Sequence, residues 1–129
     1  MFLIQAVEYN NQALELQKQG DYQGAEKLYL SSLQIKLDAL GEDHTTTALS
    51  RNALGELYLT MGRLDDAEDQ LKRAFRVRKA MGPVMDAAIS VENLAQAYEA
   101  RGDLGKALGM RLSYNTDEMM CGNSDVSDK

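Results

Sequence analysis

LGELYLTMGRLDDAE, residues 54–68, decides the fold because it places two apolar-periodic segments around Gly62 and keeps another glycine, Gly55, inside the first segment. A glycine within a helix costs about 0.5–1 kcal/mol relative to alanine. Such a glycine is usually kept where a neighbouring segment approaches closely. We therefore expect Gly55 to be a packing glycine between two helices that the turn at Gly62 connects.

The same arrangement occurs three times along the chain. Its turn segments are GDYQGAE (20–26), GRLDDAE (62–68) and GDLGKAL (102–108). Small residues recur seven positions before each turn glycine and five positions after it; they are Ala13, Gly55 and Ala95, then Ala25, Ala67 and Ala107. This period predicts three helix hairpins, six helices in all, over about residues 4–41, 42–82 and 83–114.

Residues around the expected turns support these boundaries. Asp21 and Asp103 directly follow turn glycines and are suited to N-cap positions. Gly41 and Gly82 are suited to helix C-termini, and Pro83 to the first turn of the next helix. The second helix of the middle hairpin has one apolar face that the stem of an arginine can complete, made of Leu64, Ala67, Leu71, Ala74, Phe75 and Arg78.

Composition excludes several classes of protein. The chain has 129 residues with 44% hydrophobic and 26% charged residues, which fits one globular domain. Its net charge of −6 argues against nucleic acid or an anionic membrane as the partner. The opening MFLIQAV lacks the features of a signal peptide, and no apolar run approaches the ~20 residues of a membrane span. Cys121 is the only cysteine, so we expect a reducing, cytoplasmic setting without internal disulfides.

The motif L-G-x-x-Y at Leu54, Gly55 and Tyr58, followed by Gly62, Ala67 and Ala74, resembles the tetratricopeptide repeat pattern. Arg51 and Lys79 stand where that pattern has an aromatic residue and a proline. The units are longer than the common repeat of about 34 residues and are linked by LGEDHTTTA, features that resemble the kinesin light chain type. The resemblance implies an all-α solenoid with a right-handed superhelix. It also implies a protein-interaction module without catalysis, cofactor or metal.

The first helix of each hairpin is expected to line the concave groove of such a solenoid, and this is where we expect a peptide to bind. Asparagine amides can bond an extended peptide backbone, apolar residues can receive its side chains, and glutamates favour a partner with lysine or arginine. The candidate groove residues are Asn10, Leu14, Gln17, Leu49, Asn52, Glu56, Leu59, Ile89, Asn93, Gln96 and Glu99.

Other motifs suggest less. The basic run LKRAFRVRK (71–79) is expected to be a solvated helix surface, because Glu68 and Asp69 precede Lys72 and Arg73 by four residues. His44 lies in the linker pattern and is expected to be structural. EMMC (118–121) offers sulfur ligands but is given no metal role. Cys121 could also be the first ligand of a cysteine-rich finger beyond this chain, and residues 118–129 are expected to be a disordered polar tail.

Two other functions stay open besides peptide binding. The chain could be an assembly domain that stacks within a larger protein or self-associates, or it could be a regulatory domain of a larger enzyme. Self-association through the terminal helices is favoured because neither end resembles a polar cap. At one end stand Phe2, Leu3 and Ile4, and at the other Leu104, Leu108 and Leu112.

Overall fold

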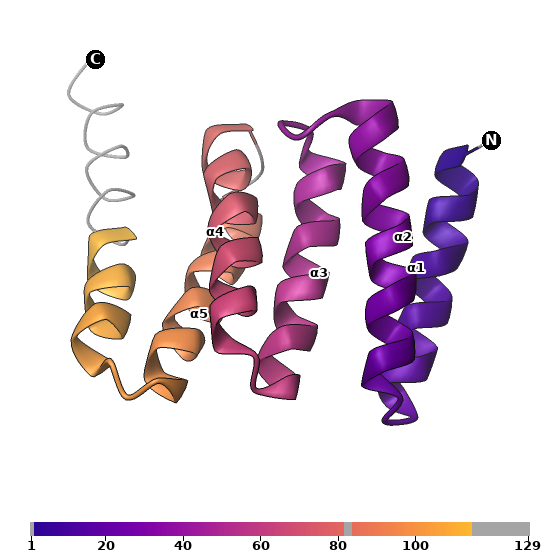
Figure 1. Cartoon of the computed structure of the whole chain (residues 1–129). Helices are drawn as coiled ribbons and strands as arrows, with labels where there is room; N and C mark the ends of the chain where they lie inside the picture. The colour runs from indigo at the N-terminus through magenta and orange to yellow at the C-terminus, as the bar shows by residue number, and fades with distance from the viewer. Residues whose placement is uncertain (1, 82–83, 115–129) are drawn as a thin grey trace, which may run out of the picture.

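A computed structural model of the chain describes residues 2–81 and 84–114, and these form only helices and turns. The helices are α1 (Phe2–Lys18), α2 (Tyr22–Leu40), α3 (Thr45–Met61), α4 (Leu64–Met81) and α5 (Val84–Ala100). A sixth helix covers residues 104–114 and is called helix 104–114 below. Figure 1 shows the helices following one another along one direction, with the N-terminus and helix 104–114 at opposite ends. The six predicted helices and their pairing are confirmed.

The contact that explains Gly55 lies between α3 and α4. A Cβ atom on residue 55 would stand 2.6 Å from the Cγ atom of Leu71, which is closer than real side chains approach. Ala67, from the same helix as Leu71, is fully buried beside this contact. Gly55 is therefore a packing glycine, as its position in the repeat predicts.

The turns and caps also agree with the sequence. Gly62 has a left-handed backbone (φ 77°) at the end of α3, which is a conformation that other residues rarely adopt. The Asp21 carboxylate accepts a hydrogen bond from the Gly24 amide at 3.0 Å and caps α2. His44 caps α3 by accepting a hydrogen bond from the Thr46 amide at its Nδ1 atom (3.0 Å), so its expected structural role is confirmed.

A polar triad repeats at both interfaces between consecutive hairpins. In the first, the Tyr58 hydroxyl donates to Glu26 at 2.7 Å and the Arg63 guanidinium donates to the same carboxylate at 2.8 Å. In the second, the Tyr98 hydroxyl donates to Glu68 at 3.3 Å, and Arg101 binds the same carboxylate. Glu26 and Glu68 occupy the same register position in α2 and α4. A side-chain contact of the same kind therefore fixes both stacking steps.

A buried cation and a serine form a second repeated contact at these interfaces. Lys36 of α2 donates to the Ser50 hydroxyl at 2.6 Å, and Arg78 of α4 donates to the Ser90 hydroxyl at 2.9 Å. Arg78 is almost fully buried. It therefore belongs to the apolar face, as its register predicts, and the expectation that the whole basic run is solvated is wrong at this residue. The stacking of α5 on α4 covers its side chain.

The other four basic side chains of the run are exposed, and the two expected ion pairs are present. Lys72 pairs with Glu68 at 2.5 Å and Arg73 with Asp69 at 3.3 Å, both four residues apart on α4. Arg51, which replaces the aromatic residue of the pattern, is buried and donates to Glu42 at 2.6 Å and Gln70 at 2.8 Å. Polar contacts therefore replace an aromatic contact at this position.

The two ends of the stack differ in chemistry. The face of α1 that corresponds to the stacking faces of α3 and α5 is polar and exposed, with Gln5, Glu8, Gln12, Glu15 and Gln19. Phe2, Leu3 and Ile4 are exposed, as the sequence predicts. The rest of this face is polar, however, so α1 resembles a polar cap more closely than its first residues indicate. The expectations for Gly82, Pro83, EMMC, Cys121 and the tail at 118–129 concern residues outside the described ranges.

Candidate peptide-binding groove

Exposed apolar side chains recur at one register position in the first helix of each hairpin. Val7 of α1, Leu49 of α3 and Ile89 of α5 stand thirteen residues before their turn glycines and are 53%, 47% and 43% exposed. Leu14, one heptad after Val7, is exposed as well. We call the surface of α1, α3 and α5 that carries these exposed apolar residues the groove face. The apolar groove residues expected from the sequence therefore face solvent, with the exception of Leu59.

Asn52 and Asn93 are bonded to each other rather than left free. They are 5% and 9% exposed, and the Asn93 amide donates to the Asn52 carbonyl oxygen at 3.4 Å. The Ser90 hydroxyl donates to that same oxygen at 3.1 Å. Because Ser90 also accepts from Arg78, a continuous polar chain crosses the interface from α4 to the groove face. The two asparagines therefore support the stacking of the hairpins, which the sequence did not indicate.

This polar chain ends at Glu56. The amides of Asn52 and Asn93 both donate to Glu56 Oε1, at 3.1 Å and 2.9 Å. Glu56 is nevertheless exposed. Two hydrogen bonds from two different helices therefore fix one carboxylate oxygen at the centre of the groove face.

The glutamates of α5 are engaged by a residue that the sequence analysis missed. Arg111 of helix 104–114 donates to both oxygens of Glu92, at 2.8 and 3.0 Å, and to both oxygens of Glu99, at 3.0 and 3.1 Å. The hydrogen bonds from Arg111 hold the pKa of both carboxyl groups below the usual range for glutamate. Glu99 is therefore not free to attract a basic partner in this arrangement.

A register comparison could have found this contact. Arg111 stands at the position that Tyr29 and Leu71 occupy in the first two hairpins. The Tyr29 hydroxyl donates to Gln17 at 3.0 Å, and Gln17 has the same register as Glu99. The middle hairpin has Leu59 there, which packs against the core. At this register position each hairpin thus pairs two side chains of similar polarity, one from each of its helices. Gln17 and Leu59 therefore contribute to the contact between the two helices of their hairpins.

The remaining expected groove residues differ in their surroundings. The Oδ1 atom of Asn10 is buried and has no hydrogen-bond partner within residues 2–81 and 84–114. Asn10 is the counterpart of Asn52, but Ala53 occupies the position that Asn93 has in the third hairpin. Asn10 therefore has no asparagine at that position of the next hairpin that could donate to its Oδ1 atom as Asn93 donates to Asn52. Gln96 is exposed on α5.

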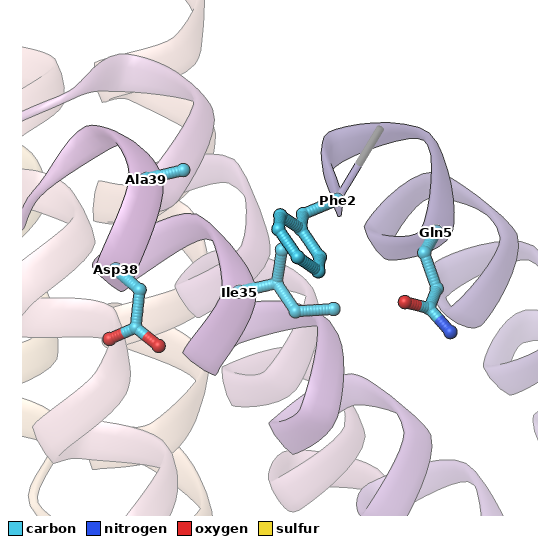
Figure 2. A pocket seen from close by; sticks show the side chains of 5 residues that line it. All are labelled: Phe2, Gln5, Ile35, Asp38 and Ala39. Carbon is cyan, nitrogen blue, oxygen red and sulfur yellow. The ribbon is translucent and has the colours of Figure 1, made fainter.

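A separate hollow of about 440 Å³ lies between α1 and α2. Figure 2 shows the side chains that line it, Phe2 and Gln5 from α1 and Ile35, Asp38 and Ala39 from α2. Gln5 already donates to the Tyr9 hydroxyl at 2.9 Å, and Asp38 accepts from Gln34 at 2.9 Å. The hollow therefore has an apolar centre and polar groups that are bonded elsewhere, so we do not assign it a ligand.

The family model for the tetratricopeptide repeat matches residues 4–80, which is more than half of the chain. The chain belongs to the tetratricopeptide repeat family. The hairpins described above are tetratricopeptide repeats, and the groove face is the face that such solenoids commonly use to bind proteins. No helix among the described residues is long and apolar enough to span a membrane.

Two solved structures are similar to this tetratricopeptide repeat chain. BtubC (BKLC) from P. vanneervenii shares 25% sequence identity, with a TM-score of 0.83 over 91% of this chain and 48% of that chain. A Podosopora anserina putative kinesin light chain with nearly identical TPR-like repeats shares 20% identity, with a TM-score of 0.79 over 89% of this chain and 56% of that chain. The chain therefore spans about half the length of these structures, and the resemblance to the kinesin light chain type is confirmed. The comparison with curated proteins gave no match.

Proposed function

We propose that the chain is a non-catalytic, intracellular interaction module whose groove face binds an extended peptide segment carrying apolar side chains and one lysine or arginine. The apolar side chains contact Leu49 and Ile89, which are exposed at equivalent positions of adjacent repeats. The basic side chain pairs with Glu56. Of the eleven candidate groove residues, the peptide thus contacts the exposed ones, and above all Leu49, Ile89 and Glu56.

The position of Glu56 carries the proposal. Its Oε1 atom accepts hydrogen bonds from Asn52 and Asn93, whereas no hydrogen bond to Oε2 is found among the described residues. A carboxylate held in place loses less side-chain entropy when it pairs with a cation than a freely rotating one does. Asn52 and Asn93 thus contribute to binding by positioning Glu56 rather than by contacting the peptide backbone.

Selection from a random peptide library tests this assignment. We expect the enriched peptides to share apolar residues and a lysine or arginine. Glu56→Gln keeps an oxygen for the two asparagine amides but removes the charge. It should weaken the binding of these peptides about tenfold at low salt, which corresponds to ~1.4 kcal/mol of binding free energy. The difference in affinity should shrink as added salt screens the ion pair.

Two further variants separate the groove from the rest of the surface. Leu49→Asp with Ile89→Asp should abolish binding, because both side chains are exposed and the change places charge in the apolar row. Glu8→Gln is the matched control and should bind normally, because Glu8 lies on the face of α1 that corresponds to the stacking face of α3 and not on the groove face. Equal affinity of the selected peptides for the groove variants and the wild-type chain would refute the assignment.

A further inference from the structure

Helix 104–114 carries a row of exposed leucines. Leu104, Leu108 and Leu112 recur every fourth residue and are 65%, 57% and 56% exposed. They lie on one face of the helix, since residues four apart are neighbours along a helix surface. In Figure 1 this helix is at the opposite end of the stack from α1. The leucine face is thus an apolar surface at one end of the described stack of helices.

Two glycines adjoin this row, and no close contact within residues 2–81 and 84–114 requires a glycine at either position. Gly105 and Gly109 are four residues apart within helix 104–114, and both are exposed. A Cβ atom on Gly109 would meet nothing within 4 Å, and one on Gly105 would meet only the Asp103 carboxylate at 4.0 Å. Gly55, in contrast, has Leu71 against it. The two glycines weaken the helix and leave its backbone without side chains beside the leucine ridge, which suits the close approach of another helix. We call this strip of the helix the glycine groove.

The leucine face differs from the stacking faces inside the molecule. Leu108 occupies the register position of Glu26 and Glu68. Each of these carboxylates accepts a hydrogen bond from a tyrosine hydroxyl of the next hairpin. A further hairpin of the same pattern would bring a tyrosine hydroxyl against Leu108, where no acceptor replaces the carboxylate. The face is therefore better suited to an apolar helix than to another hairpin of this pattern.

The other end of the molecule cannot supply that apolar helix. The stacking positions of α3 include Ser50, Leu54 and Leu57, all buried, whereas α1 has Glu8, Gln12 and Glu15 at these positions. Burying these polar and charged side chains against leucines would be unfavourable. Head-to-tail stacking of copies is thereby disfavoured.

We propose that two copies of this chain associate through helix 104–114, with the leucine ridge of each copy packed into the glycine groove of the other about a two-fold axis. A surface that carries both a ridge and a groove is self-complementary, which is the requirement for a two-fold contact. The contact is small and its affinity modest, because one helix face contributes most of it. The groove face stays free, so this association is independent of peptide binding.

Light scattering of the full chain over a concentration series tests the proposal. The mass should rise from one chain to two and then stay constant. Leu108→Glu should keep the chain monomeric over the same range. Ile4→Glu is the matched control, because Ile4 is an apolar residue at the opposite end that is even more exposed than Leu108, and it should leave the association unchanged.

Gly109→Ala distinguishes an interface glycine from a merely tolerated one. It should raise the stability of the monomer, because space is open there, and weaken association tenfold or more. Circular dichroism confirms that each variant is folded. A monomer at every concentration, growth beyond two chains, loss of association in Ile4→Glu, or unchanged association in Gly109→Ala would each overturn the proposal.

Discussion

Leu71 lies directly against Gly55, with its Cγ and Cδ2 atoms 2.6 and 2.7 Å from the place where a Cβ on residue 55 would stand. We expect Gly55→Ala to lower the free energy of unfolding by about 1–3 kcal/mol, because the added methyl group forces Leu71 from its place. This loss should exceed the gain of about 0.5–1 kcal/mol in helix propensity. Urea unfolding measures the difference.

A double-mutant cycle provides the control for this prediction. In a Leu71→Ala background the contact is gone, so Gly55→Ala should be neutral or stabilising. An equal loss of stability in both backgrounds would contradict the contact with Leu71 as the cause.

Asn52→Ala should also destabilise the fold. The Asn52 side chain is buried and bonded to Ser90, Asn93 and Glu56, so its removal leaves buried polar partners unsatisfied and should cost about 1–3 kcal/mol. Asn11→Ala, on the exposed surface of α1, is the matched control and should change stability by less than about 0.5 kcal/mol. Thermal unfolding of the two variants side by side is sufficient, and equal melting temperatures would contradict a structural role for Asn52.

The repeat register could be predicted from the sequence because it depends on residues whose requirements are local. Gly62 must adopt a left-handed backbone, and Ala67 must be small to be buried at the contact between two helices. These requirements recur at one spacing, so three copies of the pattern support one another. The turns, the caps and the role of Gly55 follow from them.

The groove could be predicted only in part, because helical periodicity places a side chain on a face but does not identify what covers it. Asn52 is on the expected face, yet Ser90 and Asn93 from the next hairpin bury it. Arg78 is likewise covered by α5 although its neighbours in the basic run are exposed. Such contacts join residues of different hairpins, so they depend on how the hairpins stack.

Lys36 gives the interface between α2 and α3 a pH dependence. Burial lowers the pKa of this ammonium group, so the unfolded chain binds its proton more tightly than the folded chain does. The stability of the wild-type chain relative to Lys36→Met should therefore rise with pH between the lowered folded-state pKa and the ordinary value of 10.5. The slope has an upper limit of about 1.4 kcal/mol per pH unit.

Urea unfolding of both proteins at several alkaline pH values measures this difference. Tyrosine ionisation is common to the two proteins and cancels in the comparison. A difference that stays constant across the range would show that Lys36 is not desolvated in the folded chain.

Arg111 should determine both the titration of the groove-face glutamates and the attachment of helix 104–114. In Arg111→Gln we expect the pKa values of Glu92 and Glu99 to rise toward the ordinary value of 4.5, because the guanidinium that lowers them is gone. Both pKa values are depressed in the folded chain, so their contribution to stability is complete above pH 4.5 and is lost as the pH falls below the folded-state values. Carboxyl NMR titration measures the pKa shifts.

Amide hydrogen exchange of helix 104–114 tests the attachment directly. In the wild-type chain, protection of this helix should fall when the pH drops below the folded-state pKa values of the two glutamates, and it should also weaken at high salt, which screens the exposed pairs. In Arg111→Gln the protection should already be lower at neutral pH and should depend little on either condition. Lys106→Gln is the matched control, because it changes a charge on the same helix at a side chain that pairs with Asp103 and lies over the Tyr98 ring but does not bind Glu92 or Glu99. Unchanged glutamate pKa values in Arg111→Gln would show that the guanidinium does not bridge the two carboxylates in solution, and closure of the third hairpin would then depend on its apolar contacts, Ala95 and Tyr98 against Ala107.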